Sequence, residues 1–240
     1  MKLTVINAVV RSNKDNTEFS KYLHKVLLPN TEIIFEQVNY GFPSIECNFH
    51  GMVNGAEVVR LAQKAENEGS DGVFVNCFDD PGVYEARELI RIPVYGAYQP
   101  AILTAMGLAD RIGIITTDKA GILSESRKAF LNGFEKRIFA VHDVDLKVLS
   151  LENNLDLLAE RLAKTCIEMY EKEQIGALTL GCTGMYKVIG LLRKKLAEAR
   201  CAVSVIEPLQ NGVSYLEHIV KAGYSNALGV IDNVDLWKSR

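Results

Sequence analysis

Short apolar and β-branched runs alternate with longer amphipathic segments along the chain. The runs Val73–Asn76, Ile112–Thr116 and Ala177–Leu180 are largely apolar at consecutive positions, which is typical of strands that helices cover on both faces of a parallel sheet. Between such runs, Met52–Glu68 and Asn154–Glu173 carry apolar residues at helical spacing and polar residues opposite them. This alternation predicts an α/β fold built from right-handed crossovers. The strands expected from the pattern are Leu3–Asn7, Glu32–Val38, Gly72–Asn76, Pro93–Gly96, Arg111–Thr116, Ile138–His142, Ala177–Leu180 and Ala202–Ile206.

The order of these segments repeats once. Each half runs strand, helix, strand, longer helix, a buried strand that ends in cysteine, helix and strand. We therefore expect two pseudo-symmetric lobes, each a mostly parallel sheet flanked by helices, with the active site between them. The first lobe is expected over residues 1–97 and the second over 98–208. The last helix, Leu209–Ala222, and the chain up to residue 240 are expected to pack back on the first lobe.

Composition and charge exclude several classes of protein. With 48% hydrophobic and 24% charged residues the chain is of ordinary globular type, and its net charge of -3 offers no basic surface for nucleic acid. The N-terminus lacks the long apolar region of a signal peptide, and no apolar stretch reaches the roughly 20 residues of a membrane span. We therefore expect a cytoplasmic protein with reduced thiols and a small-molecule substrate, and an assembly of identical subunits.

Two of the five cysteines occupy matched places in the duplicated pattern. Cys77 and Cys182 each end a buried strand, whereas Cys47, Cys166 and Cys201 are expected to be core residues. Ligands of open α/β sheets bind beyond the carboxyl ends of the strands, so pseudo-symmetry predicts two thiols facing each other across one cleft.

Two thiols on opposite sides of a substrate suit the inversion of a carbon that carries an acidic hydrogen. A thiolate can remove the proton from one face, and a thiol can deliver a proton to the other. The following helix N-termini are expected to lower the pKa of both thiols. Backbone N–H groups in the turns Phe78–Gly82 and Thr183–Met185 are expected to stabilise the enolate.

The residues around the two thiols resemble a known family. Asn76–Gly82, followed by Ala86-Arg87-Glu88, resembles the first cysteine motif of hydantoin and allantoin racemases, and Gly181–Met185 resembles their second. Ile114–Thr117 and Ile206–Pro208 fall where that family has similar segments. The resemblance covers nearly the whole chain. It implies two pseudo-symmetric α/β lobes and a proton transfer that needs no metal or other cofactor, with Cys77 and Cys182 as the acid/base pair.

The chain departs from that family at three places. Asp79 stands where the family usually has glycine, and Glu207 where aspartate is more usual. After Asn7 the chain reads Ala-Val-Val, where the family typically has Pro-Asn-Thr. The loop changes bear on the substrate more than on the chemistry.

Further candidates for substrate contact lie at strand ends. Asn7 and the pair Thr116 and Thr117 end the first strand of each lobe, where contact with substrate and capping of a turn or helix are equally consistent with the pattern. Asp79 and Asp80 are expected to cap the helix near Pro81 rather than to act in catalysis. The segment Gly41–Gly51 is either a lid or a plain surface loop. Residues beside the thiols complete the expected substrate site: Phe78, Asp79, Thr183 and Gly184.

Four functions fit these observations. The first is racemisation of 5-substituted hydantoins or allantoin. The second is racemisation of aspartate or glutamate, but those relatives typically have Asn-Thr and Thr-His after their cysteines, where this chain has Phe78-Asp79 and Thr183-Gly184. The third is a related lyase or isomerase of dicarboxylates. The fourth is a ligand-binding or redox-sensing protein in which the two thiols form a disulfide.

Overall fold

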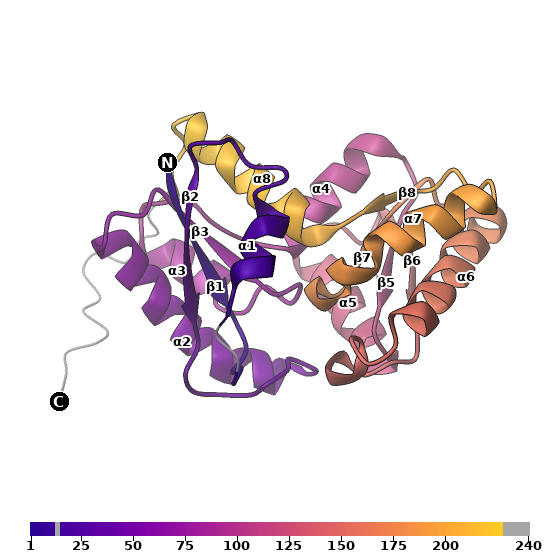
Figure 1. The fold of residues 1–240 in the computed structure, drawn as a ribbon, viewed down its shortest axis with the longest axis horizontal. Coiled ribbons are helices and arrows are strands. Elements are labelled where there is room, and N and C mark those ends of the chain that lie inside the picture. Colours follow the sequence, from indigo (N-terminus) through magenta and orange to yellow (C-terminus); the bar gives the residue numbers. More distant parts are fainter. Residues whose placement is uncertain (13–14, 228–240) are drawn as a thin grey trace.

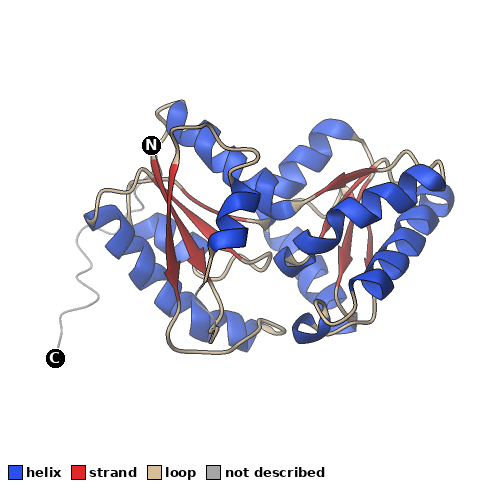
Figure 2. Ribbon diagram, viewed as in Figure 1, coloured by secondary structure: helices blue, strands red, loops and turns tan. Residues whose placement is uncertain are grey.

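Two four-stranded parallel sheets form the framework of the protein (Figures 1 and 2). The computed structural model describes residues 1–12 and 15–227. The first sheet has the strand order β2-β1-β3-β4 and the second the order β6-β5-β7-β8, so both halves follow one topology. This confirms the predicted fold class and the internal duplication. The strands are β1 (Lys2–Asn7), β2 (Glu32–Gln37), β3 (Gly72–Asn76), β4 (Val94–Gly96), β5 (Ile112–Thr116), β6 (Ile138–Asp143), β7 (Ala177–Leu180) and β8 (Ser204–Ile206).

Helices cover the faces of both sheets, as the apolar strands require (Figure 2). Asn154 begins the longest helix of the second lobe by accepting a hydrogen bond from the N–H of Leu157 at 2.9 Å. The helix expected to begin at Met52 begins instead at Asn48, so the predicted loop is shorter. The helices are α1 (Thr17–Leu23), α2 (Asn48–Asn67), α3 (Val83–Leu89), α4 (Tyr98–Leu108), α5 (Lys119–Leu131), α6 (Leu155–Glu173), α7 (Ile189–Glu198) and α8 (Pro208–Lys221), with 3₁₀ turns at Val148–Ser150 and Thr183–Val188.

The lobes are joined by an exchange of helices. Helix α4 directly follows the first sheet but packs on β7 and β8 of the second. Helix α8 follows the second sheet but packs on β3 and β4 of the first, where Leu216 and Val220 lie over Gly72. The two helices also pack on each other (Figure 1). One apolar cluster therefore extends from Phe74 in β3 through these helices to Ile114 in β5.

Gly82 shapes the turn that follows Cys77. It has a φ of 73°, in the left-handed region, and precedes the first residue of α3. A Cβ on Gly82 would lie 2.5 Å from the carbonyl oxygen of Gly55 in α2. The turn is thus pressed against α2, and a side chain at this position would displace it.

We expect Gly82→Ala to destabilise the protein more than Gly69→Ala. Gly69 has a nearly identical φ of 77°, but a Cβ there would have no described atom within 4 Å. Both variants incur the cost of left-handed backbone, roughly 1–2 kcal/mol. Only Gly82→Ala adds the clash with α2, about 1–3 kcal/mol more. Urea denaturation measures both, and equal losses would contradict a tightly packed turn.

Candidate active site

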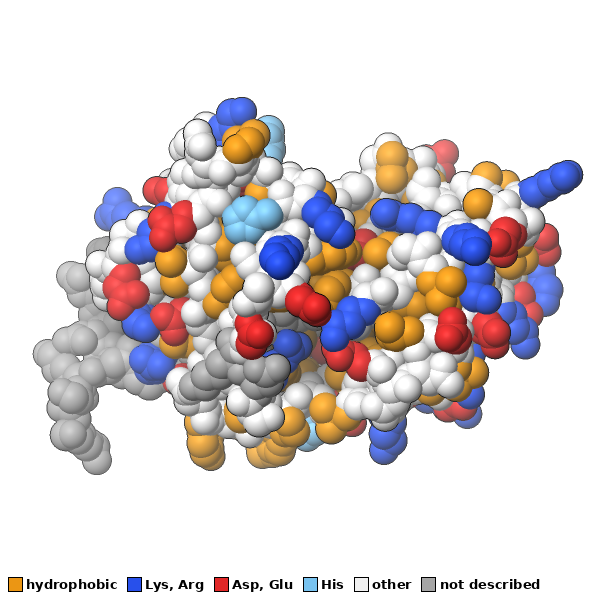
Figure 3. All heavy atoms as spheres, viewed as in Figure 1, with side chains coloured by type: hydrophobic (Ala, Val, Ile, Leu, Met, Phe, Trp, Pro, Cys, Tyr) orange, Lys and Arg blue, Asp and Glu red, His pale blue; other side chains and the backbone are white. Residues whose placement is uncertain are grey.

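The carboxyl ends of β3 and β7 open into one cleft of about 880 Å³, lined by residues of both lobes. Cys77 directly follows β3 and Cys182 follows β7 by two residues; both line the cleft and are partly exposed. In Figure 3 the surface is hollowed between the lobes, with side chains of both charge signs around the hollow. The structure thus brings together the two thiols that the sequence singles out.

The two thiols have matching surroundings. The backbone N–H of Asp79 lowers the pKa of Cys77, and the backbone N–H of Gly184 lowers that of Cys182. The residues between, Phe78 and Thr183, have backbone N–H groups without a hydrogen-bond partner in the described part of the chain. Beside each thiol there is thus one backbone N–H that lowers its pKa and one that has no acceptor among the described residues.

The thiol pKa values run opposite to expectation. Burial raises the pKa of Cys182 to about 11, although the N–H of Gly184 has the opposite effect and lowers it. Burial and the nearby Asp79 carboxylate raise the pKa of Cys77 well above its ordinary value. The prediction of lowered pKa values is wrong because burial outweighs the neighbouring N–H groups. The helix α3 begins only at Val83, and a 3₁₀ turn, not an α-helix, directly follows Cys182. Without substrate, both groups are therefore predominantly thiols at neutral pH.

Asn7 lies beneath the cleft rather than on its surface. Its side chain is 1% exposed, and its Oδ1 accepts a hydrogen bond from Nδ2 of Asn76 at 2.9 Å. Asn76, the last residue of β3, lines the cleft beside Cys77. Asn7 thus contacts the cysteine turn through Asn76, and its direct contact with substrate stays a prediction.

The substrate-site candidates of the second lobe do line the cleft. Thr116 and Thr117 lie at the end of β5, and Thr183 and Gly184 lie beside Cys182. The capping alternative for the two β5 threonines is wrong, because Asp118 caps α5 by accepting the N–H of Gly121 at 3.1 Å. This leaves the threonines free of a capping role.

Phe78 lines the cleft, but the two aspartates after it have other partners than the helix cap expected for them. The Phe78 side chain is 2% exposed, and its ring packs edge-on against Tyr98 in the core. Neither aspartate caps α3, whose preceding residue is Gly82. Asp79 pairs with Lys128 at 3.0 Å, and Asp80 accepts the N–H of Tyr98 at 3.1 Å.

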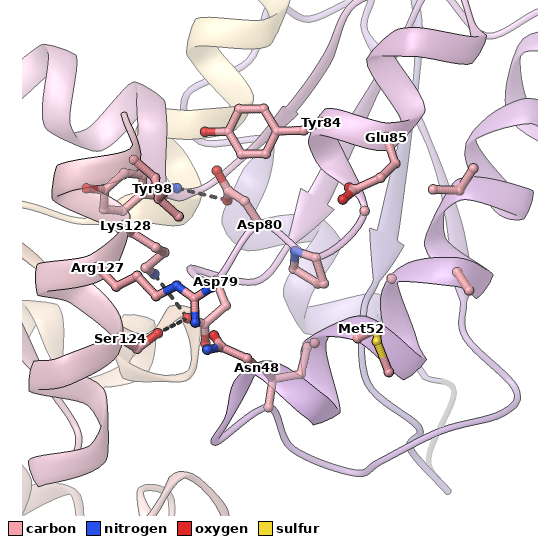
Figure 4. Close-up of a pocket in the computed structure, with 18 of the residues that line it drawn as sticks. Asn48, Met52, Asp79, Asp80, Tyr84, Glu85, Tyr98, Ser124, Arg127 and Lys128 are labelled. Atoms are coloured by element: carbon pink, nitrogen blue, oxygen red, sulfur yellow. Dashed lines mark hydrogen bonds and ion pairs between the residues drawn. The ribbon is translucent and has the colours of Figure 1, made fainter. Parts of the chain in front are cut away.

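A second cavity of about 890 Å³ shares Asp79 and Ser124 with the cleft (Figure 4). Asp80 lines only this second cavity, together with Met52 and Tyr84. Burial raises the pKa of Asp80 to about 6. Of the two aspartates, only Asp79 therefore borders the proposed substrate space.

Sequence reasoning missed the charged face of α5. Ser124 and Lys128 of this helix contact the cysteine turn of the first lobe, and Glu125 pairs with Lys128 at 2.8 Å. Burial raises the pKa of Glu125 to about 8, against the ammonium of Lys128, which lowers it. The i, i+3 spacing of these two residues was the available signal, because it places opposite charges on one helical face.

The remaining candidates fall into structural places. Glu207 caps α8 through the N–H groups of Leu209 and Gln210. Residues 43–47 of the predicted lid segment line the cleft, and Ile45 and Cys47 also line the second cavity. Cys166 is a core residue as predicted, but Cys47 is exposed because it lies in this segment just before α2.

The described residues contain neither a group of metal ligands nor a helix that could span a membrane. No three histidine, cysteine or carboxylate side chains in the described ranges are grouped as metal ligands would be. Within the same ranges, no helix combines the length and apolarity needed to cross a membrane.

Comparison with known proteins identifies the family. The family model described as Asp/Glu/Hydantoin racemase matches residues 16–216. A hydantoin racemase of Rhizobium meliloti is 33% identical over 166 residues, which are 69% of this chain and 66% of that protein. The structure of allantoin racemase from Klebsiella pneumoniae superimposes with a TM-score of 0.83 and 31% identity, covering 94% of this chain and 90% of that one. Allantoin racemase from Pseudomonas fluorescens, at 22% identity, shares the fold with a TM-score of 0.84 over 98% of this chain and 99% of its own.

The match extends over more than half of the chain and includes both cysteine turns. The protein therefore belongs to the Asp/Glu/hydantoin racemase family of isomerases.

Proposed function

We propose that the protein is a cofactor-independent racemase of 5-substituted hydantoins or allantoin. The observation that carries this proposal is the placement of Cys77 and Cys182 at equivalent strand ends of opposite lobes, on one cleft. The names of the relatives from Rhizobium meliloti and Klebsiella pneumoniae support the same substrate class.

The proposed reaction exchanges one proton for another. The thiolate of one cysteine takes the proton from the stereogenic carbon, so a C–H bond breaks and an S–H bond forms. The thiol of the other cysteine then gives its proton to the opposite face, leaving a thiolate on that side. Charge on the intermediate enolate oxygen is stabilised by a backbone N–H such as that of Phe78 or Thr183.

The charges of the cleft support a substrate without a carboxylate. Asp79 is paired with Lys128, and Lys187 with Glu152 at 2.6 Å. An anionic substrate would lose water in a cleft where carboxylates are in excess and these two lysines are already paired, which is unfavourable. The described acidic residues of the cleft wall outnumber the basic ones: Asp15, Glu18, Glu46, Asp79, Asp118, Glu125 and Glu152 against Arg11 and Lys187.

We place the boundary of the lobes near residue 97, and the packing of α4 on β7 and β8 supports this proposal. Residues 228–240 of the segment assigned to the first lobe lie outside the described residues. A cytoplasmic location and an assembly of identical subunits stay predictions from the sequence.

We expect Cys77→Ser and Cys182→Ser each to reduce racemisation by about 10²–10⁴-fold, because a serine hydroxyl is a much weaker acid than a thiol. Each variant should still exchange the proton of one enantiomer with D₂O, since one face keeps its base. Chiral chromatography and NMR measure the two effects. Cys201→Ser, outside the cleft, is the control, and near-normal racemisation by either cleft variant excludes the two-thiol mechanism.

We expect kcat/KM to rise with pH between about 6 and 9. The free enzyme needs one thiolate, and the raised pKa values of both cysteines make that form scarce at neutral pH. Each pH unit should therefore increase the active fraction up to about tenfold until the lower thiol pKa is reached. The substrate's own ionisation is titrated separately, and a kcat/KM that is constant or falls over this range contradicts the raised pKa values.

We expect a 5-substituted hydantoin or allantoin to be racemised faster than aspartate or glutamate. The carboxylates of the cleft wall repel the amino acids, whereas a ureide ring offers carbonyl and N–H groups to the backbone donors and threonines. The kcat/KM values of 5-benzylhydantoin, allantoin, L-aspartate and L-glutamate decide this. If an amino acid is the best substrate, the substrate class is wrong although the two-thiol mechanism can stand. If none of the four is racemised and Cys77 and Cys182 form a disulfide quantitatively, the redox-sensor alternative holds.

A further inference from the structure

Lys128 belongs to the second lobe but holds the cysteine turn of the first. Its ammonium donates to the carbonyl oxygen of Phe78 at 2.9 Å and to Oδ1 of Asp79 at 3.0 Å. These two residues directly follow Cys77 in the chain. Figure 4 shows Lys128 reaching from α5 to Asp79, with Ser124 of the same helix on the same carboxylate at 3.3 Å. One helix of the second lobe thus fixes both the backbone and the charge of the turn.

The surroundings of Lys128 keep it charged. Burial would lower the pKa of Lys128, but Asp79 and Glu125 together raise it above its ordinary value. The ammonium also lies 4.9 Å from the centre of the Phe78 ring and 4.8 Å from that of Tyr98, within the range of cation–π attraction. A largely buried cation with several partners has little freedom to move.

The carboxylates around Lys128 are not equivalent. Glu125 lies 2.8 Å from the ammonium with its side chain 2% exposed, and its Oε2 has no hydrogen-bond partner in the described chain. Asp79 is 30% exposed and carries the bonds from both Lys128 and Ser124. Burial raises the pKa of the deeper Glu125 to about 8, and Asp79 is the partner of Lys128 that belongs to the turn after Cys77.

We propose that Lys128 is a positioning residue for Cys77. By binding the turn after Cys77 from the opposite lobe, Lys128 fixes the position of this thiol and the charges around it. The proposal rests on the proposed racemase function for its catalytic meaning. It makes the two thiols unequal. The ammonium of Lys128 opposes the pKa rise that burial and Asp79 impose on Cys77, whereas the cation that acts on Cys182 is Arg11.

The test compares the reactivity of each cysteine as pH is varied. Lys128→Met, Lys128→Arg and wild-type protein are treated with iodoacetamide without substrate, and peptide mass spectrometry follows Cys77 and Cys182 separately. We expect Lys128→Met to slow the alkylation of Cys77 about tenfold at a given pH, an upward pKa shift of about one unit, with Cys182 unchanged. Lys128→Arg keeps the charge and should restore much of the effect. Lys172→Met, which removes an exposed lysine on α6, is the matched control.

Asp79→Asn separates electrostatics from loss of structure. Because Asp79 raises the pKa of Cys77, its removal should speed alkylation, opposite to the effect of Lys128→Met. Circular dichroism and thermal melting establish that each variant is folded. If Cys77 reacts alike in Lys128→Met and Lys172→Met, or if both variants of the ion pair shift it in one direction, the proposal is overturned.

Racemisation supplies the functional measurement. At an equilibrium constant of one, kcat/KM must fall by the same factor for both enantiomers in Lys128→Met. One enantiomer loses its proton to Cys77. The KM of this enantiomer should rise relative to the KM of the other enantiomer, and the ratio of the two kcat values should change by the same factor. Unchanged kinetics for both enantiomers would overturn the catalytic meaning of the proposal. If wild-type protein racemises none of the compounds, the proposed function fails, and the alkylation result still decides whether Lys128 controls Cys77.

Discussion

The burial of α4 and α8 between the two sheets is the interaction on which the site depends. Each helix follows one sheet in the chain and packs on the other, so the apolar cluster from Phe74 to Ile114 belongs to both lobes. Because close-packed interiors are not continuously deformable, this cluster fixes how the carboxyl ends of β3 and β7 face each other. The cleft and its two thiols follow from that apposition.

Polar contacts between the lobes position the turns that follow the strands. Lys128 of α5 binds the turn after β3, while Tyr22 of α1 donates to the carboxylate of Glu207, just after β8, at 2.9 Å. Each contact joins a residue in the first half of the chain to a residue in the second half. The apolar core thus sets the distance between the lobes, and these partly buried polar contacts hold the orientation of individual turns.

The strands and helices could be predicted from the pattern of neighbouring residues. Contacts between residues far apart in the sequence could not. The buried runs before Cys77 and Cys182 can be found from the sequence because their apolar character is contained in a few adjacent residues. The roles of Asp79 and Asp80 could not, because their partners Lys128 and Tyr98 lie 49 and 18 positions away. The same reason explains the thiol pKa values, which depend on how tightly other elements surround each sulfur.

The exchange of helices also has a consequence for the order in which the protein is made. Residues 1–97 leave the ribosome with the face of β3 uncovered, because its cover is Leu216 and Val220 of α8, the last described helix. The first lobe therefore completes its core only after the second lobe has been synthesised. During elongation its strands must remain incompletely packed, and chaperones that bind exposed apolar segments have their natural target in the half of the chain that is made first.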